Sequence, residues 1–596
     1  MRANLFIVIV TVLVFCNSTL ADRDILADTY LDKLHGMWLG EILGNYAGRP
    51  YEGNCARGGL VVTVDWNSFI NTDPWHGDDD TCFEYAYMNV LKSNATPSNA
   101  DIKAAWETHV PLPSFYIANK QARWLMADGL APPQTGSINK NMHWYAIDSQ
   151  ITTEAMGVAA PGLRQRSSDL AGQFGSVTND GYAVHAAQFY SAMYAAAAFE
   201  SDTETLVAKG LEVVPVTSRT HQIIQDVVGW YSADKSDGSL DWRATQEKIY
   251  DKYVGTDSKG RYRYWIESTV NTGLTTMAVL YGQGDFKETV EIGVLGGFDC
   301  DCNPATAGGL IGLINGYSGL PTNLTGAASD NYHVDTLVNI LKDTTISQVA
   351  ADWQTVAEAQ ILAAGGSISG SGAGRTYHLP DADNIGPLTE KPDPVGPKGL
   401  VGQVLAAGGT VTVSSSIEYH NPDNDRQNLD AIIDGITDVS YNGHLPYMTD
   451  DGENSQPVGG DYYQLNFDRD VTFGAVVFYE GDIKWNGINS DPMDSEPRGG
   501  YFLNLIVEVG DDGAFIEVSD LHMSEALDKF EYFQIIELTF DQVVGDAIRI
   551  RGDAGGTGQF TSIVELEAYV PEPATVVLLA FGGWVLLLMR RNRQTG

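Results

Sequence analysis

A segment rich in glycine and proline divides the 596-residue chain into two parts with different patterns of apolar residues. Residues 365–374 are rich in glycine and serine, and residues 391–397 have the proline content of a stiff linker. Before this segment apolar residues recur at helical spacing, as in residues 83–91. After it, short runs of alternating apolar and polar residues are separated by turns, which is typical of a β-sandwich.

The sequence therefore predicts a multidomain protein: an all-α domain at residues 22–390, a linker at 391–399 and an all-β sandwich at 400–569. The two parts are expected to fold independently, because each contains enough apolar residues for a core of its own. The strands expected in the second part are residues 410–414, 462–467, 475–479, 503–509, 536–540, 547–551 and 563–570.

Both ends of the chain carry apolar segments with the features of targeting signals. Residues 1–21 combine an early arginine, an apolar run and a final Thr-Leu-Ala, which predicts a secretory signal peptide cleaved after Ala21. Residues 570–573 read Val-Pro-Glu-Pro and are followed by an apolar stretch at 574–589 and an arginine-rich end. This tail at 570–596 resembles the PEP-CTERM sorting signal of Gram-negative bacteria. The resemblance implies a transmembrane helix that anchors the protein temporarily and an exosortase-type protease as a processing partner.

A permanent membrane anchor is the alternative for this tail, and both alternatives place the body of the protein outside the cytoplasm. The net charge of −41, from 77 acidic and 36 basic residues, argues against a nucleic-acid partner and favours binding of cations. Four cysteines remain after signal removal, too few for a disulfide scaffold. A bridge between Cys55 and Cys82 stays open.

Two aspartate clusters are separated by more than two hundred residues, and each precedes a run with helical spacing. The first is Asp78-Asp79-Asp80-Thr81 and the second is Asp299-Cys300-Asp301-Cys302-Asn303. Adjacent carboxylates repel one another unless a cation neutralises them, and oxygen-rich clusters suit hard divalent cations. We therefore expect the two clusters to form one metal site. The alternative is that the first cluster only caps the N-terminus of a helix.

Three segments together resemble the ADP-ribosylglycohydrolase family, the all-helical dimetal hydrolases that remove ADP-ribose from modified targets. They are residues 36–52, with glycines at 36, 40, 44 and 48; residues 78–81; and residues 297–303 with the glycine-rich run after them. The resemblance covers about residues 30–365. It implies two divalent cations, Mg or Mn ahead of Zn, and an acid–base role for Glu52. The implied metal ligands are Asp78, Asp79, Asp80, Asp299, Asp301 and Cys302.

The chain departs from the family pattern at several of these positions. Asp78 replaces a threonine and Asn45 stands where an aspartate is common. Cys302 replaces the last threonine of the second cluster, so its softer sulfur either shifts metal preference towards Mn or Zn or leaves the coordination sphere. Glu52 has an ordinary alternative as a surface glutamate in a loop.

The residues expected to bind substrate also depart from the family. Glu154, Met156 and Gly157 lie where the family places a substrate loop, and Gly157 replaces an arginine. Asn179 replaces a histidine, with Asp180 next to it. These changes remove one cation and one imidazole from the expected pocket and put ADP-ribose in doubt as the substrate.

The second part resembles discoidin-type, galactose-binding-like sandwiches in residues 433–435, 462–467, 509–513, 547–551 and 565–567. The resemblance implies a glycan or exopolysaccharide partner at loops on one end. A structural Ca ion often accompanies such domains and is an option here.

These inferences together predict a secreted or surface-anchored hydrolase that cleaves an N- or O-glycosidic bond of an ADP-ribosylated or related ribosylated substrate. Divalent cations can hold the diol of a ribose and lower the pKa of a bound water, and a carboxylate can transfer the proton. The alternative is a non-catalytic surface or matrix-binding protein with a degenerate hydrolase domain.

Overall fold

The computed structural model describes most of the first part and the greater share of the second. The described residues are 23–112, 115, 117–254, 265–380, 385, 410–413, 429–433, 447–449, 460–481, 483, 497 and 499–569. The predicted signal peptide, linker and sorting tail lie outside them. Within the described ranges, none of the helices is both long enough and apolar enough to span a membrane.

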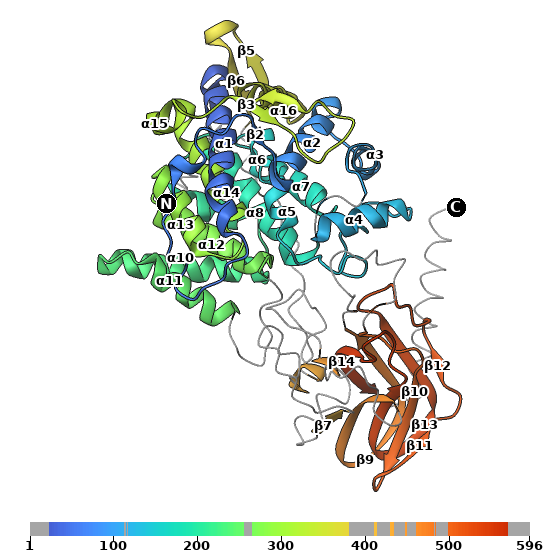
Figure 1. Cartoon of the computed structure of the whole chain (residues 1–596). Helices are drawn as coiled ribbons and strands as arrows, with labels where there is room; N and C mark the ends of the chain where they lie inside the picture. The colour runs from blue at the N-terminus through green and yellow to red at the C-terminus, as the bar shows by residue number, and fades with distance from the viewer. Residues whose placement is uncertain are drawn as a thin grey trace, which may run out of the picture.

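The first part is helical, as predicted, and forms the upper body of the molecule in Figure 1. Its helices are α1 (Ala27–Gly48), α2 (Asp79–Ser93), α3 (Asn99–His109), α4 (Ile117–Ala127), α5 (Asp148–Thr153), α6 (Met156–Ala159), α7 (Arg164–Gly175), α8 (Gly181–Ala197), α9 (Thr203–Leu211), α10 (Arg219–Asp237), α11 (Trp242–Ile249), α12 (Ser268–Tyr281), α13 (Phe286–Gly296), α14 (Cys302–Asn315), α15 (Thr322–Thr325) and α16 (Ile346–Ala363).

Two small sheets lie at the margin of the helices. One has the strand order β1-β6-β5, from Arg23–Leu26, Thr376–Leu379 and Ser367–Ser369. The other has the order β2-β3-β4, from Trp75–His76, Asn331–His333 and Asp343–Thr345. The parallel pairing of β2 with β3 places His76 opposite His333 and so brings the chain on either side of the first aspartate cluster to residues 331–336.

Helices α1 and α14 pack with their backbones in contact because glycines face one another along the interface. A Cβ atom built on Gly40 would lie 2.4 Å from the carbonyl oxygen of Gly308, and one on Gly36 would lie 2.4 Å from that of Gly312. At the end of α1, a Cβ atom on Gly48 would lie 1.7 Å from the carbonyl oxygen of Cys300. No other residue fits these contacts, so the glycines fix the end of α1 against the second aspartate cluster.

The second part is a sheet-rich domain, as predicted. Its strands are β7 (Thr410–Val413), β8 (Tyr447–Met448), β9 (Asp461–Glu480), β10 (Ile506–Asp511), β11 (Ala514–Glu517), β12 (His522–Met523), β13 (Ile535–Gly552) and β14 (Ser562–Tyr569). The main path runs β11-β10-β13-β9-β14-β8, with β12 on β13 and β7 on β9. A separate apolar core fills this domain, including Phe473, Phe478 and Ile548.

The sheet-rich domain contacts a loop of the helical domain between α4 and α5 (Figure 1). Asn139 donates its side-chain N–H to the carbonyl of Tyr532 at 2.8 Å, and the Tyr532 backbone N–H donates to the carbonyl of Asn139 at 3.1 Å. Trp144 and Val564 are buried together in a small apolar cluster that spans the two domains. The contact therefore has both a polar and an apolar component.

Candidate active site and metal centre

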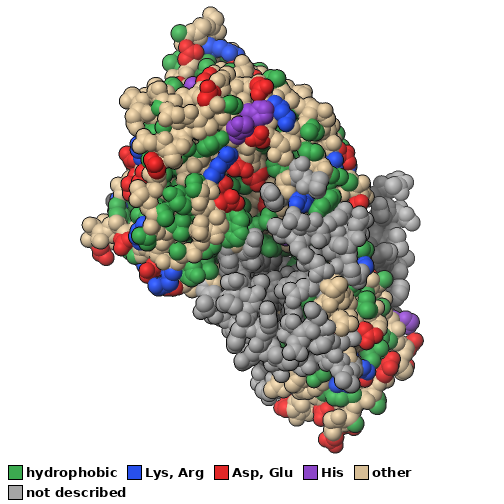
Figure 2. Space-filling model, in the orientation of Figure 1, with side chains coloured by type: hydrophobic (Ala, Val, Ile, Leu, Met, Phe, Trp, Pro, Cys, Tyr) green, Lys and Arg blue, Asp and Glu red, His purple; other side chains and the backbone are tan. Residues whose placement is uncertain are grey.

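A cavity of about 480 Å³ in the helical domain collects residues from both aspartate clusters. Figure 2 shows acidic side chains gathered on this face of the helical domain, beside histidine and cationic side chains. The cavity has an acidic side and an apolar, largely aromatic or branched side. The lining residues are Glu52, Gly77, Asp78, Asp79, Phe115, Ile117, Ile147, Asp148, Ile151, Trp265, Ile266, Asp299, Asp301, Cys302 and Thr336.

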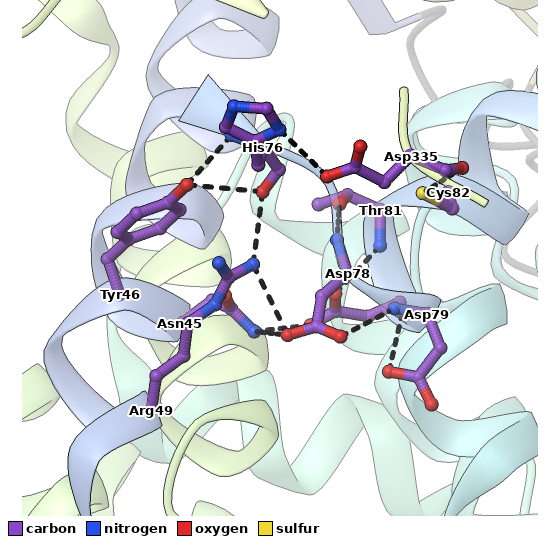
Figure 3. Close-up of polar contacts among 10 residues, drawn as sticks. Asn45, Tyr46, Arg49, His76, Asp78, Asp79, Thr81, Cys82 and Asp335 are labelled. Atoms are coloured by element: carbon purple, nitrogen blue, oxygen red, sulfur yellow. Dashed lines mark hydrogen bonds and ion pairs between the residues drawn. The ribbon is translucent and has the colours of Figure 1, made fainter. Parts of the chain in front are cut away.

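The first cluster lies at the start of α2. Asp78 is the N-cap: its Oδ1 accepts the N–H of Asp79 at 2.9 Å, and Thr81 completes a capping box. Asp79 lines the cavity, and its carboxylate points away from Asp78 in Figure 3. Asp80 is buried, and burial together with the charge of Asp78 raises its pKa well above the usual value. Capping and metal binding are therefore compatible here, because different carboxylates of the cluster face different partners.

The second cluster lies at the start of α14, which begins at Cys302. Asp299, Asp301 and Cys302 each offer one ligand atom, and these atoms lie within 4.8 Å of one another. Asp301 is buried, and its Oδ1 accepts no hydrogen bond from the described residues. Burial, and next the charge of Asp78, raise the pKa of Asp301 to about 6. An unpartnered buried carboxylate oxygen beside a second carboxylate and a thiol fits a divalent cation.

The loop that leads into this cluster is held in an unusual backbone conformation. Gly297 and Phe298 both have positive φ, 86° and 67°, and a non-glycine residue in this region stores strain that the surroundings must hold. The surroundings are the segment after α1: the Gly53 N–H donates to the Phe298 carbonyl, and the Phe298 N–H donates to the Asn54 carbonyl, each at 2.9 Å. This pairing places Glu52 beside the second cluster.

Glu52 lies at the mouth of the cavity, just after the short helix η1 (Arg49–Tyr51). Partial burial raises its pKa to about 7, with the charges of Asp301 and Asp78 adding to the rise and Arg49 opposing it. A carboxyl group that titrates near neutrality can both accept and donate a proton under ordinary conditions. This position and pKa are those that a general acid or base requires.

Arg49 crosses from the end of α1 to the first cluster (Figure 3). Its Nη2 lies 3.2 Å from Oδ2 of Asp78 and donates to the carbonyl of His76 at 3.0 Å. Its Nε donates to Oδ1 of Asn45 at 2.6 Å, and the guanidinium lies 4.1 Å from the ring centroid of Tyr46. Four partners thus fix the guanidinium next to the acidic side of the cavity.

Sequence reasoning missed several lining residues. Asp148 is the first residue of α5, is buried, and accepts the N–H of Asn119 at 3.0 Å; burial raises its pKa to about 7. Trp265 and Phe115 form much of the apolar side. A lone aspartate after Ala146-Ile147 was the available signal for Asp148, whereas nothing near Trp265 or Phe115 distinguishes them from core residues.

The five residues expected to bind substrate lie behind the cavity, and none of them lines it. Glu154 is buried and accepts the hydroxyl of Thr306 at 2.8 Å. Met156 is in the core, and Gly157 packs against the Cβ of Tyr194 and the backbone of α8. The Asn179 amide donates to the carbonyls of Trp144 and Ala146, and Asp180 caps α8. The contacts of Asn179 with Trp144, Ala146 and Ser149 support the segment 144–149, which carries part of the cavity wall.

The fold and the cavity define a helical domain whose acidic candidate metal site is built at the starts of two helices that are distant in sequence. The model of the ADP-ribosylglycohydrolase family matches residues 26–355, more than half of the chain, and the chain belongs to this family. Membership of this family supports a glycosidic hydrolase-like function, and proteins of the family typically use divalent metals.

Similar solved structures are found for both domains. One is described as an ADP-ribosylglycohydrolase-related protein complex, with 14% identity over 56% of this chain and 99% of that chain, and a TM-score of 0.37. Another is the family 32 carbohydrate-binding module of Clostridium perfringens NanJ in complex with galactose, with 15% identity over 28% and 96%, and a TM-score of 0.20. A third is from the Streptococcus pneumoniae β-galactosidase BgaA, with 10% identity over 28% and 91%, and a TM-score of 0.22. None of the curated proteins matches this sequence.

Proposed function

We propose that the protein hydrolyses an N- or O-glycosidic bond at the anomeric carbon of an ADP-ribosylated or related ribosylated substrate. The observation that carries the proposal is the cavity itself, in which Asp79, Asp299 and Asp301 face the same space as Glu52. Two clusters distant in sequence meet there, and a carboxyl group with a pKa near 7 stands beside them. The family membership adds independent support.

The residues of the cavity have separate tasks in this proposal. Asp299, Asp301 and Cys302, with Asp79 nearby, hold a divalent cation, Mg or Mn ahead of Zn. When bound, such an ion can coordinate the diol of a ribose and lower the pKa of a bound water molecule. Glu52 exchanges the proton with water or the leaving group, and Trp265 and Phe115 exclude solvent and pack against the sugar or the group attached to it.

The experiment is an assay of the purified full-length protein with Mn or Mg. Substrates are a protein ADP-ribosylated on arginine (N-linked), one ADP-ribosylated on serine (O-linked) and a set of simple ribosides, and release is followed by chromatography. Glu52→Gln is expected to lower kcat strongly and leave the bound metal unchanged. If the metal-loaded protein releases nothing from any substrate yet binds ADP-ribose, the domain is a degenerate binding module.

Cys302 decides the choice of metal in this proposal. If its sulfur is a ligand, Cys302→Thr weakens binding of Zn relative to Mg, because a hydroxyl is a harder donor than a thiolate. Competition titrations of the two proteins with both metals measure the change. Identical preferences would show that the cysteine only packs.

The other parts of the chain have proposed roles outside catalysis. We propose that the sheet-rich domain binds a glycan or exopolysaccharide, and that the protein is exported and anchored transiently through residues 570–596. A glycan array with residues 398–569 tests the first role. Deletion of residues 571–596 tests the second: the truncated protein is expected in the medium, and its retention in the membrane would contradict the anchor.

A further inference from the structure

The carboxylate of Asp78 is already occupied by protein groups on both of its oxygens. Oδ1 accepts the N–H of Asp79 as the N-cap of α2. Oδ2 faces Arg49 at 3.2 Å and the side-chain N–H of Asn45 at 3.4 Å. Its charge is balanced by the guanidinium, so this member of the first cluster differs from Asp301, which has an oxygen without a hydrogen-bond donor among the described residues.

The guanidinium is held firmly enough to act as a fixed positive charge. It stands at the C-terminal end of α1, where a cation is favoured by the helix dipole, and it also contacts Asn45, the carbonyl of His76 and the ring of Tyr46. Figure 3 shows it between α1 and the start of α2, directed at Asp78 and away from the carboxylate of Asp79. A side chain with this many partners is held in place beside Asp78.

Two of the departures from the family pattern are the direct partners of this arginine. Asn45 stands where an aspartate is common, and Asp78 stands where a threonine is usual. Arg49 donates to the first and pairs with the second. The arginine thus lies between Asn45 near the end of α1 and Asp78 at the start of α2.

A divalent cation on Asp78 would lie within a few Å of the guanidinium. Metal–oxygen bonds are about 2.0–2.6 Å long, and like charges so close together repel strongly in a partly buried site. The other side of the cavity has no such conflict, because Asp299, Asp301 and Cys302 present their ligand atoms within 4.8 Å of one another. The geometry thus separates the ligand atoms of Asp299, Asp301 and Cys302 from the carboxylate of Asp78, whose charge the guanidinium already balances.

We propose that this cavity holds a single divalent cation, on Asp299, Asp301 and Cys302, and that Arg49 supplies the positive charge that a second ion would otherwise bring. The inference rests on the proposed function only in assuming that the cavity binds a divalent cation. Asp78 is then a positioning residue that orients Arg49 and starts α2. Arg49 sets the number of metal ions that the site accepts.

The experiment counts Mn ions in the full-length protein by equilibrium dialysis and elemental analysis, with electron paramagnetic resonance to distinguish an isolated ion from a coupled pair. The wild type is expected to hold one isolated ion. Arg49→Met removes the charge and keeps much of the packing on Tyr46, and it is expected to hold two coupled ions. Arg49→Lys retains the charge and is expected to hold one.

Arg375→Ala is the matched control, because Arg375 also pairs with a carboxylate, Glu358, and lies over a tyrosine, Tyr377, but at the start of β6 and beside α16. It is expected to leave the count at one. Two ions in the wild type, or one ion in both wild type and Arg49→Met, would overturn the inference and leave the proposed hydrolase intact. A wild-type protein that holds no ion would contradict both the single-ion inference and the metal-dependent step of the proposed function.

Asp78→Asn gives a second measurement that does not depend on the arginine variants folding. If Asp78 is not a ligand, the affinity for Mn changes less than about threefold, whereas Asp301→Asn loses more than about 100-fold, beyond the 10–100-fold typical of residues that only support ligands. A loss of more than about 100-fold in Asp78→Asn, as large as that of Asp301→Asn, would show that Asp78 binds the ion and would refute the proposal.

Discussion

The cavity of the helical domain and the strand pair β10–β13 of the sheet-rich domain both bury carboxylates, but they balance the charge differently. In the sheet, Glu508 accepts from Nε of Arg549 at 2.7 Å and from Nε of Arg551 at 2.9 Å. Burial alone would raise the pKa of Glu508, but the two arginines outweigh it and hold the pKa below its usual value. In the cavity, burial and neighbouring aspartates raise the pKa of Asp301 to about 6.

The difference separates a structural charge from a functional one. The carboxylate of Glu508 is stable as it stands, because its partners belong to the same sheet. The carboxylates of Asp299 and Asp301 outnumber the cations near them, and their arrangement is favourable only when a cation or protons enter. Buried carboxylates therefore contribute to stability in one domain and are arranged for ligand binding in the other.

The largest effect is expected from a substitution that removes a carboxylate from the cavity and leaves the sheet-rich domain unchanged. Asp301→Asn is expected to lower metal affinity and the rate of hydrolysis each by more than about 100-fold, because a direct ligand is lost. Titration calorimetry and the hydrolysis assay measure the two losses. Glu508→Gln is the control and is expected to leave both unchanged, so a metal defect in that variant would erase the distinction between the two sites.

The next largest effect is expected from protonation of the buried carboxyl groups in the cavity. In the metal-free protein the pKa of Asp301 is about 6 and that of Asp148 about 7, above the values of about 3.9 in an unfolded chain. The folded state then binds more protons at these two groups, so their contribution to the stability of the helical domain is complete below about pH 4 and is lost as the pH rises through 6 and 7.

Adding Mn is expected to offset this loss, by about 2.7 kcal/mol at a hundredfold excess over Kd. Melting temperatures with and without Mn, at pH 5 and pH 8, check the prediction. The stabilisation by Mn is expected to be larger at pH 8, since protons compete with the metal at pH 5. A stabilisation that is equal at both values would contradict it.

The two amide variants are also expected to change the free energy of unfolding with opposite signs. Glu508→Gln weakens the charged hydrogen bonds from Arg549 and Arg551 and is expected to destabilise the sheet-rich domain by about 1–3 kcal/mol. Asp301→Asn removes a repelled charge and is expected to stabilise the metal-free helical domain at pH 8. Denaturant unfolding of both variants measures the pair, and destabilisation by Asp301→Asn in the metal-free protein would refute the reading of the cavity.

The smallest expected effect concerns the contact between the domains. Asn139→Ala removes the hydrogen bond to the carbonyl of Tyr532 and is expected to cost about 1 kcal/mol of interdomain stability. The loop of Asn139 leads to α5, so loss of the interdomain contact is expected to lower the melting temperature of the separated helical domain. The domain is expected to keep its metal, because Asp299, Asp301 and Cys302 all belong to it. Loss of metal binding on separation would show that the sheet-rich domain helps to build the cavity.

The sequence predicted the helical and sheet-rich parts because apolar periodicity records them directly. It resolved the second part less well: the runs expected at 462–467 and 475–479 are one long strand, β9, and those at 536–540 and 547–551 are one strand, β13. The β13–β9 pairing shifts register between Thr539 and Val543 and between Gly545 and Ala547. The polar residues at these bends resemble loops in the sequence, yet the backbone pairing continues on both sides of them.

For the site, motif spacing identified the acidic residues but not the wall opposite them. Asp79, Asp299 and Asp301 were predicted as metal ligands from the two local carboxylate clusters, and the structure places all three in the lining of one cavity. Trp265 and Phe115 were not predicted, since an aromatic residue that lines a cavity has no local signal that separates it from one in the core. Asn179 and Glu154 were expected to bind substrate but do not line this cavity, because tertiary packing pairs Asn179 with the segment 144–149 and Glu154 with Thr306.

The glycine contact between α1 and α14 limits how this protein can evolve. At most protein interfaces a larger residue on one helix can be accommodated by a smaller one on the other. Here Gly36 meets Gly312 and Gly40 meets Gly308, so both sides already carry the smallest residue and no compensating substitution exists. Variation in the active site must therefore arise at its edges, at positions such as Asn45, Arg49 and Asp78, while the separation of the two helices stays constant.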